Sequence, residues 1–147
     1  MDRQRLFTQL RLHEGVEHMP YKCSAGFLTI GVGRNIEERG LSDDEIDYIL
    51  NNDVNIATDE LVKTFDWYPD LDEVRQRVVI DMVFNLGMPR FQQFKKMIQA
   101  LDEGDYKEAS IQMMDSRWAS QVGQRSERLR DMMESGEEDR KSACRER

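Results

Sequence analysis

The first residues of the chain place apolar side chains at helical spacing. Leu6 and Leu10 lie four positions apart, so both fall on one face of a helix that we predict over residues 2–13. Gly15 follows shortly afterwards, and glycine commonly ends a helix. The pattern therefore predicts a short N-terminal helix.

The hydrophobic pattern changes from helical spacing to alternation over residues 20–34. Pro20 opens this segment, and we expect a turn at residues 24–26. Gly31 and Gly33 indicate a close approach of the backbone, either to a ligand or to a packed side chain. We predict a β-hairpin or a small meander here. Its alternating apolar positions are Leu28, Ile30 and Val32.

A signal for the start of a long helix follows at Ser42. This serine precedes Glu45 by three residues, which is the spacing of a capping box. Apolar positions then continue at helical spacing to about Phe65, where residues 67–69, Trp-Tyr-Pro, interrupt them. We predict one long helix that links a small N-terminal lobe to a larger C-terminal lobe.

The rest of the chain has a helical pattern throughout. Asp70 and Glu73 form a second capping pattern, before an apolar helix that ends at Gly87 and Pro89. We expect that helix to form the centre of the C-terminal lobe. The fold class is therefore α+β, mostly helical. The later helices are expected at residues 90–101, 105–115 and 124–135, with Met113, Met114, Met132 and Met133 as core residues.

The composition is that of a globular protein with an acidic surface. Of the 147 residues, 39% are hydrophobic and 34% are charged, and the formal net charge is −8. Such a charge disfavours nucleic acid as a partner. No apolar run approaches the roughly 20 residues that span a bilayer, and the polar start lacks a signal peptide or signal anchor. No residue spacing indicates a metal site, and we expect no cofactor.

The end of the chain differs in composition from the body. Residues 137–147 hold four acids, four bases and almost no apolar side chain, so we predict a disordered tail after a single domain at residues 1–136. The two cysteines are Cys23 and Cys144. We expect both to stay reduced in a cytoplasm and not to pair, because Cys144 lies in this tail.

One run near the N-terminus has the composition of a catalytic site. Glu14 ends the first helical pattern, Cys23 follows after eight intervening residues, and Thr29 follows after five more. A carboxyl group at a helix end would then face a cysteine and a threonine on the hairpin. Glycosidases need this arrangement, with an acid on one side of the scissile bond and a base or nucleophile on the other.

The run resembles the phage-type lysozymes of glycoside hydrolase family 24, typified by the lysozyme of the T-even coliphages. That family carries Glu, eight residues, Asp, five residues and Thr. The resemblance implies that Glu14 is the general acid and that Thr29 holds the attacking water, with Cys23 at the family's aspartate position. It also implies a two-lobed lysozyme-like fold.

The resemblance covers most of the chain. Residues 116–118, Ser-Arg-Trp, match the family directly. Phe84 and Asn85 stand at positions where the family contacts substrate, through an aromatic ring and an amide. Arg125 matches the arginine that pairs with the catalytic glutamate in the family, which implies that it orients Glu14.

Three roles are open for Cys23. As a thiolate it attacks the anomeric carbon, or it orients or deprotonates an attacking water, or it is a passive replacement in an impaired enzyme. A free thiol has a pKa of about 8.5, so a neighbouring group must lower it for the thiolate to dominate at neutral pH. We favour a working role, because Lys22 and Ser24 place the cysteine at a polar turn.

The resemblance implies an endolysin that hydrolyses the β-1,4 bond between N-acetylmuramic acid and N-acetylglucosamine in bacterial peptidoglycan, for host cell lysis. A lytic transglycosylase, which uses one glutamate and no attacking water, also fits the missing aspartate. A non-catalytic wall-binding module with a decayed lysozyme site is the third possibility.

The implied partner is peptidoglycan, which a phage holin makes accessible. We therefore expect the protein in the host cytoplasm before lysis and then in the periplasm and cell wall. We also expect a monomer with no stable association with a membrane.

Overall fold

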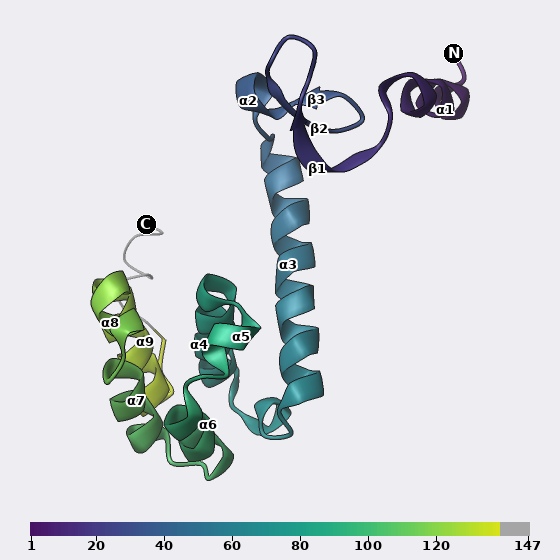
Figure 1. The fold of residues 1–147 in the computed structure, drawn as a ribbon. Helices are drawn as coiled ribbons and strands as arrows, with labels where there is room; N and C mark the ends of the chain where they lie inside the picture. The colour runs from purple at the N-terminus through teal and green to yellow at the C-terminus, as the bar shows by residue number, and fades with distance from the viewer. Residues whose placement is uncertain (139–147) are drawn as a thin grey trace. The chain divides into compact units, whose positions relative to one another are not determined.

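The computed structural model of the protein describes residues 1–138. Residues 139–147, with most of the predicted tail and Cys144, lie outside the described residues. The chain forms two compact units, Met1–Ile49 and Leu50–Arg147, called the first and second unit below. The long helix α3 (Asp43–Thr64) contributes residues to both units (Figure 1).

The first unit begins with helix α1 (Arg3–Glu14), which confirms the predicted N-terminal helix to within one residue at each end. Asp2 caps its start, because its side chain accepts a hydrogen bond from the backbone N–H of Arg5 at 3.1 Å. Gly15 ends the helix with φ at +79°, a value that L side chains rarely adopt. Glu14 is therefore fixed as the last helical residue.

A three-stranded antiparallel sheet follows, in the order β1-β2-β3, as the predicted meander requires. Pro20 does not open the sheet, because β1 already begins at Glu17. The proline is tolerated inside β1 since this is an edge strand, and the register of β1 with β2 is irregular between Glu17 and Tyr21. The strands are β1 (Glu17–Lys22), β2 (Leu28–Gly31) and β3 (Arg34–Asn35).

Two helices follow the sheet. The four-residue helix α2 (Ile36–Arg39) was not predicted from the sequence; Asn35 caps it. The capping box before α3 is confirmed: the N–H of Glu45 donates to the Ser42 hydroxyl at 3.3 Å, and the N–H of Ser42 donates to the Glu45 carboxylate at 2.8 Å.

The capping prediction for the next helix, α4 (Glu73–Leu86), is wrong by two residues. Asp70 ends a short 3-10 helix, η1 (Tyr68–Asp70), and Asp72 is the residue that caps α4. The side chain of Asp72 accepts a hydrogen bond from the N–H of Arg75 at 3.2 Å. Both aspartates precede a helical pattern, and the 3-10 helix that contains Pro69 and Asp70 leaves Asp72 to cap α4.

Substitution of each aspartate in turn should therefore show which of the two caps α4. We expect Asp72→Ala to lower the free energy of unfolding by about 1 kcal/mol, because an N–H of the first turn loses its acceptor. Thermal unfolding followed by circular dichroism measures this as a Tm lower by about 4 °C. Asp70→Ala is the matched control, and a drop of equal size in that variant would contradict the assignment.

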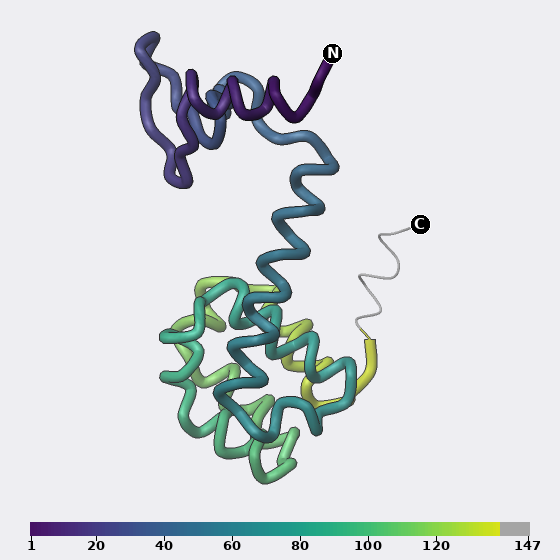
Figure 2. The backbone as a smooth tube through the Cα atoms, turned by 90° about the vertical axis from the view of Figure 1, so that its right-hand side faces the viewer, coloured from purple at the N-terminus to yellow at the C-terminus, as the bar shows by residue number. Residues whose placement is uncertain are grey.

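The later helices of the second unit differ from the prediction at two points. The single helix expected at residues 90–101 is two helices, separated by a non-helical segment at 92–94, and α8 was not predicted. Helix α7 packs against both α6 and α9, and α9 also packs on α4 (Figure 2). The helices are α5 (Met88–Phe91), α6 (Lys95–Asp102), α7 (Tyr106–Met114), α8 (Arg117–Val122) and α9 (Gln124–Ser135).

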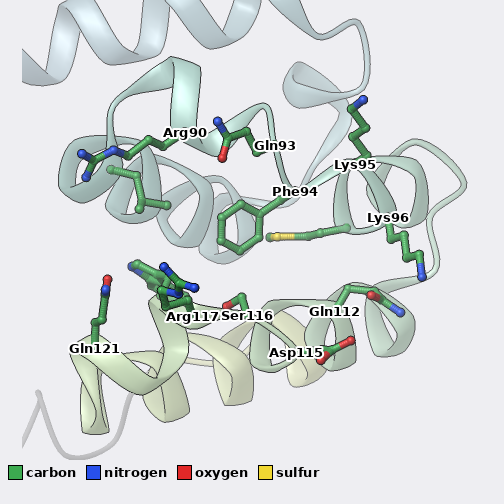
Figure 3. Close-up of a pocket in the computed structure, with 13 residues that line it drawn as sticks. Arg90, Gln93, Phe94, Lys95, Lys96, Gln112, Asp115, Ser116, Arg117 and Gln121 are labelled. Atoms are coloured by element: carbon green, nitrogen blue, oxygen red, sulfur yellow. The ribbon is translucent and has the colours of Figure 1, made fainter.

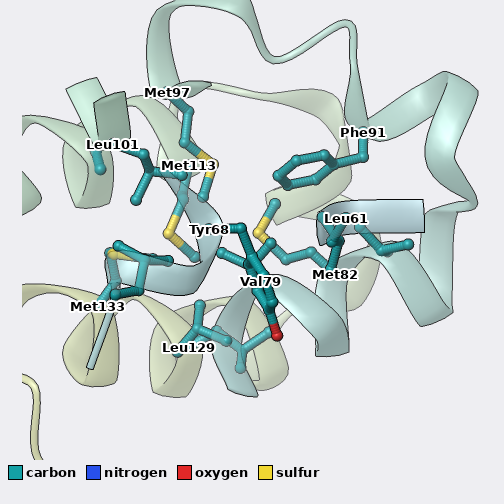
Figure 4. Packing of buried hydrophobic residues seen from close by; sticks show 14 of the residues in the cluster. Leu61, Tyr68, Val79, Met82, Phe91, Met97, Leu101, Met113, Leu129 and Met133 are labelled. Atoms are coloured by element: carbon teal, nitrogen blue, oxygen red, sulfur yellow. The ribbon is translucent and has the colours of Figure 1, made fainter. Parts of the chain in front are cut away.

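The described hydrophobic core lies in the second unit, around α4 (Figure 4). Val78, Val79 and Met82 of α4 are fully buried, which confirms α4 as the centre of this unit. Met113 and Met133 are also fully buried, and Met114 and Met132 pack against the core, as predicted. None of the helices within residues 1–138 is both long and apolar enough to cross a membrane.

Candidate active site

Glu14 is exposed at the end of α1, and its carboxylate lies close to Gly33. A Cβ atom on Gly33 would lie 2.7 Å from Oε2 and 3.0 Å from the carboxyl carbon of Glu14. Within residues 1–138, no side chain or backbone group forms a hydrogen bond or an ion pair with this carboxylate. The carboxylate therefore lies against the backbone at Gly33 without a hydrogen-bond or ion-pair partner among these residues.

Gly33 lies in the turn between β2 and β3 and has φ at +67°. A larger residue would be strained there and would also collide with Glu14. The close approach predicted for the two glycines of this segment is thus confirmed for Gly33. At Gly31 a Cβ atom would meet nothing within 4 Å among the described residues, so the packed side chain is not found there.

Cys23 and Thr29 share one hydrogen-bond acceptor, the carbonyl oxygen of Phe27. The backbone N–H of Cys23 and the hydroxyl of Thr29 each donate to it at 2.9 Å. Cys23 also starts a turn in which its carbonyl accepts the N–H of Gly26 at 2.8 Å, which confirms the predicted turn at residues 24–26. The thiol and the hydroxyl are therefore held by the same short loop.

The loop also changes the acidity of Cys23. Backbone hydrogen bonding from Phe27 is the largest cause that lowers the pKa of the thiol, followed by that from Ala25. Partial loss of hydration opposes this, and hydrogen bonds from the Thr29 side chain and the Gly26 backbone lower the pKa further. The net direction is a pKa below the ordinary thiol value, so a larger fraction is thiolate at neutral pH.

The pH dependence of alkylation tests this electrostatic effect. The rate of reaction of Cys23 with iodoacetamide should rise with pH through a midpoint below that of a free thiol measured in the same way, because the thiolate reacts. A midpoint at or above that of a free thiol in the unmodified protein would contradict the loop geometry.

The other predicted site residues lie in the second unit. Phe84 is 47% exposed near the end of α4, as a substrate-contact residue must be. The side-chain oxygen of Asn85 accepts a hydrogen bond from Nε1 of Trp118 at 2.8 Å, which fixes the orientation of the amide. Arg125 pairs with Asp81 at 2.6 Å, and its predicted role in orienting Glu14 stays a prediction.

A pocket of about 770 Å³ opens in the second unit beside Trp118 (Figure 3). Phe94 and Trp118 form an aromatic wall, and their rings meet edge to face at 6.2 Å between centroids. Asp115 is the single acidic residue of the lining. Unlike the chain as a whole, the pocket is therefore cationic. Its basic residues are Arg90, Lys95, Lys96 and Arg117.

Two features of this region could not be located from the sequence. The contact of Gly33 with Glu14 joins a helix end to a hairpin turn, and only the general expectation of a close approach was available. Backbone groups of Phe27 and Ala25 are the main causes that lower the pKa of Cys23. Every residue has the same backbone groups, so a residue pattern does not reveal their effect. Lys22, the cation next to Cys23 in the sequence, is not among the causes of the shift.

A helix-end glutamate, a small sheet with a threonine and a cysteine, and a helical second unit are together the features of a lysozyme-like α+β protein. The chain belongs to the phage lysozyme family, whose model matches residues 11–134. This family membership implies a glycosidase that acts on peptidoglycan.

Two of the similar proteins illustrate the range of the family. A probable T4-type lysozyme of Dictyostelium discoideum is 26% identical over 158 residues, covering 86% of this chain and 92% of the relative. A SAR-endolysin of Escherichia phage Mu is 32% identical over 127 residues, covering 82% of this chain and 70% of the relative. A lysozyme or endolysin role follows from these similarities.

Proposed function

We propose that this chain is an endolysin that hydrolyses the β-1,4-glycosidic bond between N-acetylmuramic acid and N-acetylglucosamine in bacterial peptidoglycan. The observation that carries the proposal is the carboxylate of Glu14, which is exposed and has no partner within residues 1–138. Such a group is available to give a proton to a bound substrate. Cys23 and Thr29 lie on the hairpin of the same unit.

Hydrolysis then proceeds with a defined role for each group. Glu14 in its acid form gives its proton to the glycosidic oxygen while the bond from that oxygen to the anomeric carbon breaks. A water molecule adds to the anomeric carbon, and its proton passes to the thiolate of Cys23. The Thr29 oxygen accepts a hydrogen bond from this water, because its own hydrogen is donated to Phe27.

The second unit supplies contacts for the polymer. Phe84 and Asn85 contact the glycan, and the family resemblance gives Arg125 the role of orienting Glu14. The cations of the pocket in Figure 3 complement the carboxylates that peptidoglycan carries on its peptides. An acidic protein gains affinity for an acidic polymer in this way, since the attraction is local rather than due to net charge.

The biological role that fits this activity is lysis of a bacterial host. The enzyme acts as a monomer and has no stable association with a membrane. It waits in the host cytoplasm until a holin opens the membrane, and it then degrades the wall from the periplasmic side. No cofactor takes part in the proposed reaction.

Product analysis tests the reaction type. Purified peptidoglycan should yield muropeptides that end in reducing N-acetylmuramic acid, because water is the acceptor. Mass spectrometry distinguishes them from anhydro-muropeptides, which are lighter by one water. Anhydro products as the main species would favour a lytic transglycosylase, and no soluble product at all would favour a non-catalytic wall-binding module.

A further inference from the structure

The contact between Gly33 and Glu14 raises the question of what holds Gly33 in place. The strand after this glycine, β3, is only two residues long, and it pairs with β2 through Thr29 with Asn35 and Ile30 with Arg34. So short a pairing fixes the turn weakly. A second anchor is therefore needed on the β3 side of the turn.

Arg34, the residue directly after Gly33, supplies such an anchor. Its two terminal nitrogens donate to the two carboxylate oxygens of Glu45, at 2.9 Å and 2.5 Å, and one of them also donates to the carbonyl of Gly40 at 3.0 Å. A bidentate arginine–carboxylate pair restricts both distance and orientation. The guanidinium thus joins the hairpin turn to the connection before α3 and to α3 itself.

Glu45 is itself held in place from the other side. It lies in the first turn of α3, and its carboxylate accepts the N–H of Ser42 at 2.8 Å as part of the capping box. Arg34 holds the pKa of this carboxyl down at about 2, so the pair stays ionised throughout the neutral range. The charges of the anchor therefore do not change with pH within the neutral range.

We propose that Arg34 is a positioning residue of the active site, which through its bidentate pair with Glu45 holds the Gly33 turn against the Glu14 carboxylate. The inference rests on the proposed function, because it assumes that Glu14 is the general acid. Loss of the anchor lets the turn move away from the carboxylate that Gly33 approaches closely. The affected quantity is the rate of proton donation and not the affinity for substrate.

Kinetics of Arg34→Gln on purified peptidoglycan test the proposal. We expect kcat to fall by about 10- to 100-fold, the effect of a misplacement of the order of 1 Å, with KM nearly unchanged. Arg34→Lys should recover part of the loss, because it keeps the charge without the bidentate geometry. Arg39→Gln on α2 is the control, since this exposed arginine has no side-chain partner within residues 1–138.

A double-mutant cycle separates positioning of Glu14 from a general loss of structure. In a Glu14→Gln background, Arg34→Gln should cause almost no further loss of kcat, because the group that it positions is already disabled. Hydrogen exchange should accelerate in residues 31–35 and stay unchanged in α4. Equal losses in both backgrounds, or a normal kcat in the single variant, would overturn the proposal.

The same measurements distinguish a failed inference from a failed function. An inactive parent protein, or normal turnover in Glu14→Gln, would remove the proposed function itself. A parent that requires Glu14 but tolerates Arg34→Gln would remove only the positioning role. Should Arg34→Gln not fold, Glu45→Gln breaks the same pair from the other side and must give the same kinetic pattern.

Discussion

Glu14→Gln should abolish peptidoglycan hydrolysis while the fold persists. An amide has nearly the shape of the carboxyl group, but it cannot donate the proton that the glycosidic oxygen needs. General acid catalysis contributes about two to four decades of rate, so kcat should fall by that amount. Release of reducing ends from purified peptidoglycan, followed with time, measures the loss.

The fold should tolerate this change, because the Glu14 carboxylate has no hydrogen bond or ion pair to lose within residues 1–138. Glu134→Gln is a matched control, since Glu134 is also an exposed glutamate near the end of a helix, α9. The control should keep full activity, and both variants should keep the parental Tm. Near-normal turnover in Glu14→Gln would show that another group is the acid.

Much of this fold follows from the sequence where the signal is local. The capping box at Ser42 and Glu45 predicts the start of α3, because both hydrogen bonds join residues three positions apart. The helices that were missed, α2 and α8, have four and six residues, which is too short for hydrophobic periodicity to show.

The cap of α4 shows a different limit of sequence reasoning. Asp70 and Asp72 both precede the helix at plausible spacing, and Asp70 has Glu73 three positions later. The structure favours Asp72, since Asp70 is the last residue of the 3-10 helix η1, which contains Pro69. A local pattern thus identified the helix correctly but could not choose between two adjacent caps.

The candidate site was predictable as a motif and not as a geometry. The spacing of Glu14, Cys23 and Thr29 is a sequence fact, whereas the neighbours that define each group are distant in sequence or belong to the backbone. Arg125 illustrates this, because its partner in the second unit, Asp81, is 44 positions away. No periodicity or spacing relates two such residues, so the ion pair became visible only in the structure.

The largest expected effect after that of Glu14 concerns Cys23. If the thiol works in the reaction, iodoacetamide should inactivate the enzyme, and a bound chitooligosaccharide should slow the inactivation. The turn around residues 23–26 supports this reactivity, because its backbone and the Thr29 hydroxyl lower the pKa of the thiol. Cys144→Ser should leave both activity and sensitivity to the reagent unchanged, which makes it the control.

The activity of variants at Cys23 should depend on the acidity and basicity of the new side chain and not on its size. We expect Cys23→Ser to lose about two to four decades of kcat, because a serine hydroxyl is a far weaker acid than a thiol and does not serve as a base at neutral pH. Cys23→Asp should retain much more activity, since a carboxylate can also accept a proton from water. Full activity in Cys23→Ser would show that the residue is a passive replacement.

The anomeric configuration of the product and the presence of a covalent sugar adduct show how Cys23 acts. Attack by the sulfur forms a covalent glycosyl-enzyme and gives retained configuration, whereas activation of a water gives inversion. We expect inversion, because the family resemblance gives Thr29 the role of holding the attacking water, and its hydroxyl donates its own hydrogen to Phe27. Mass spectrometry of the intact protein during turnover should therefore find no adduct. A glycosyl adduct on Cys23 would contradict water activation and assign the thiolate as the nucleophile.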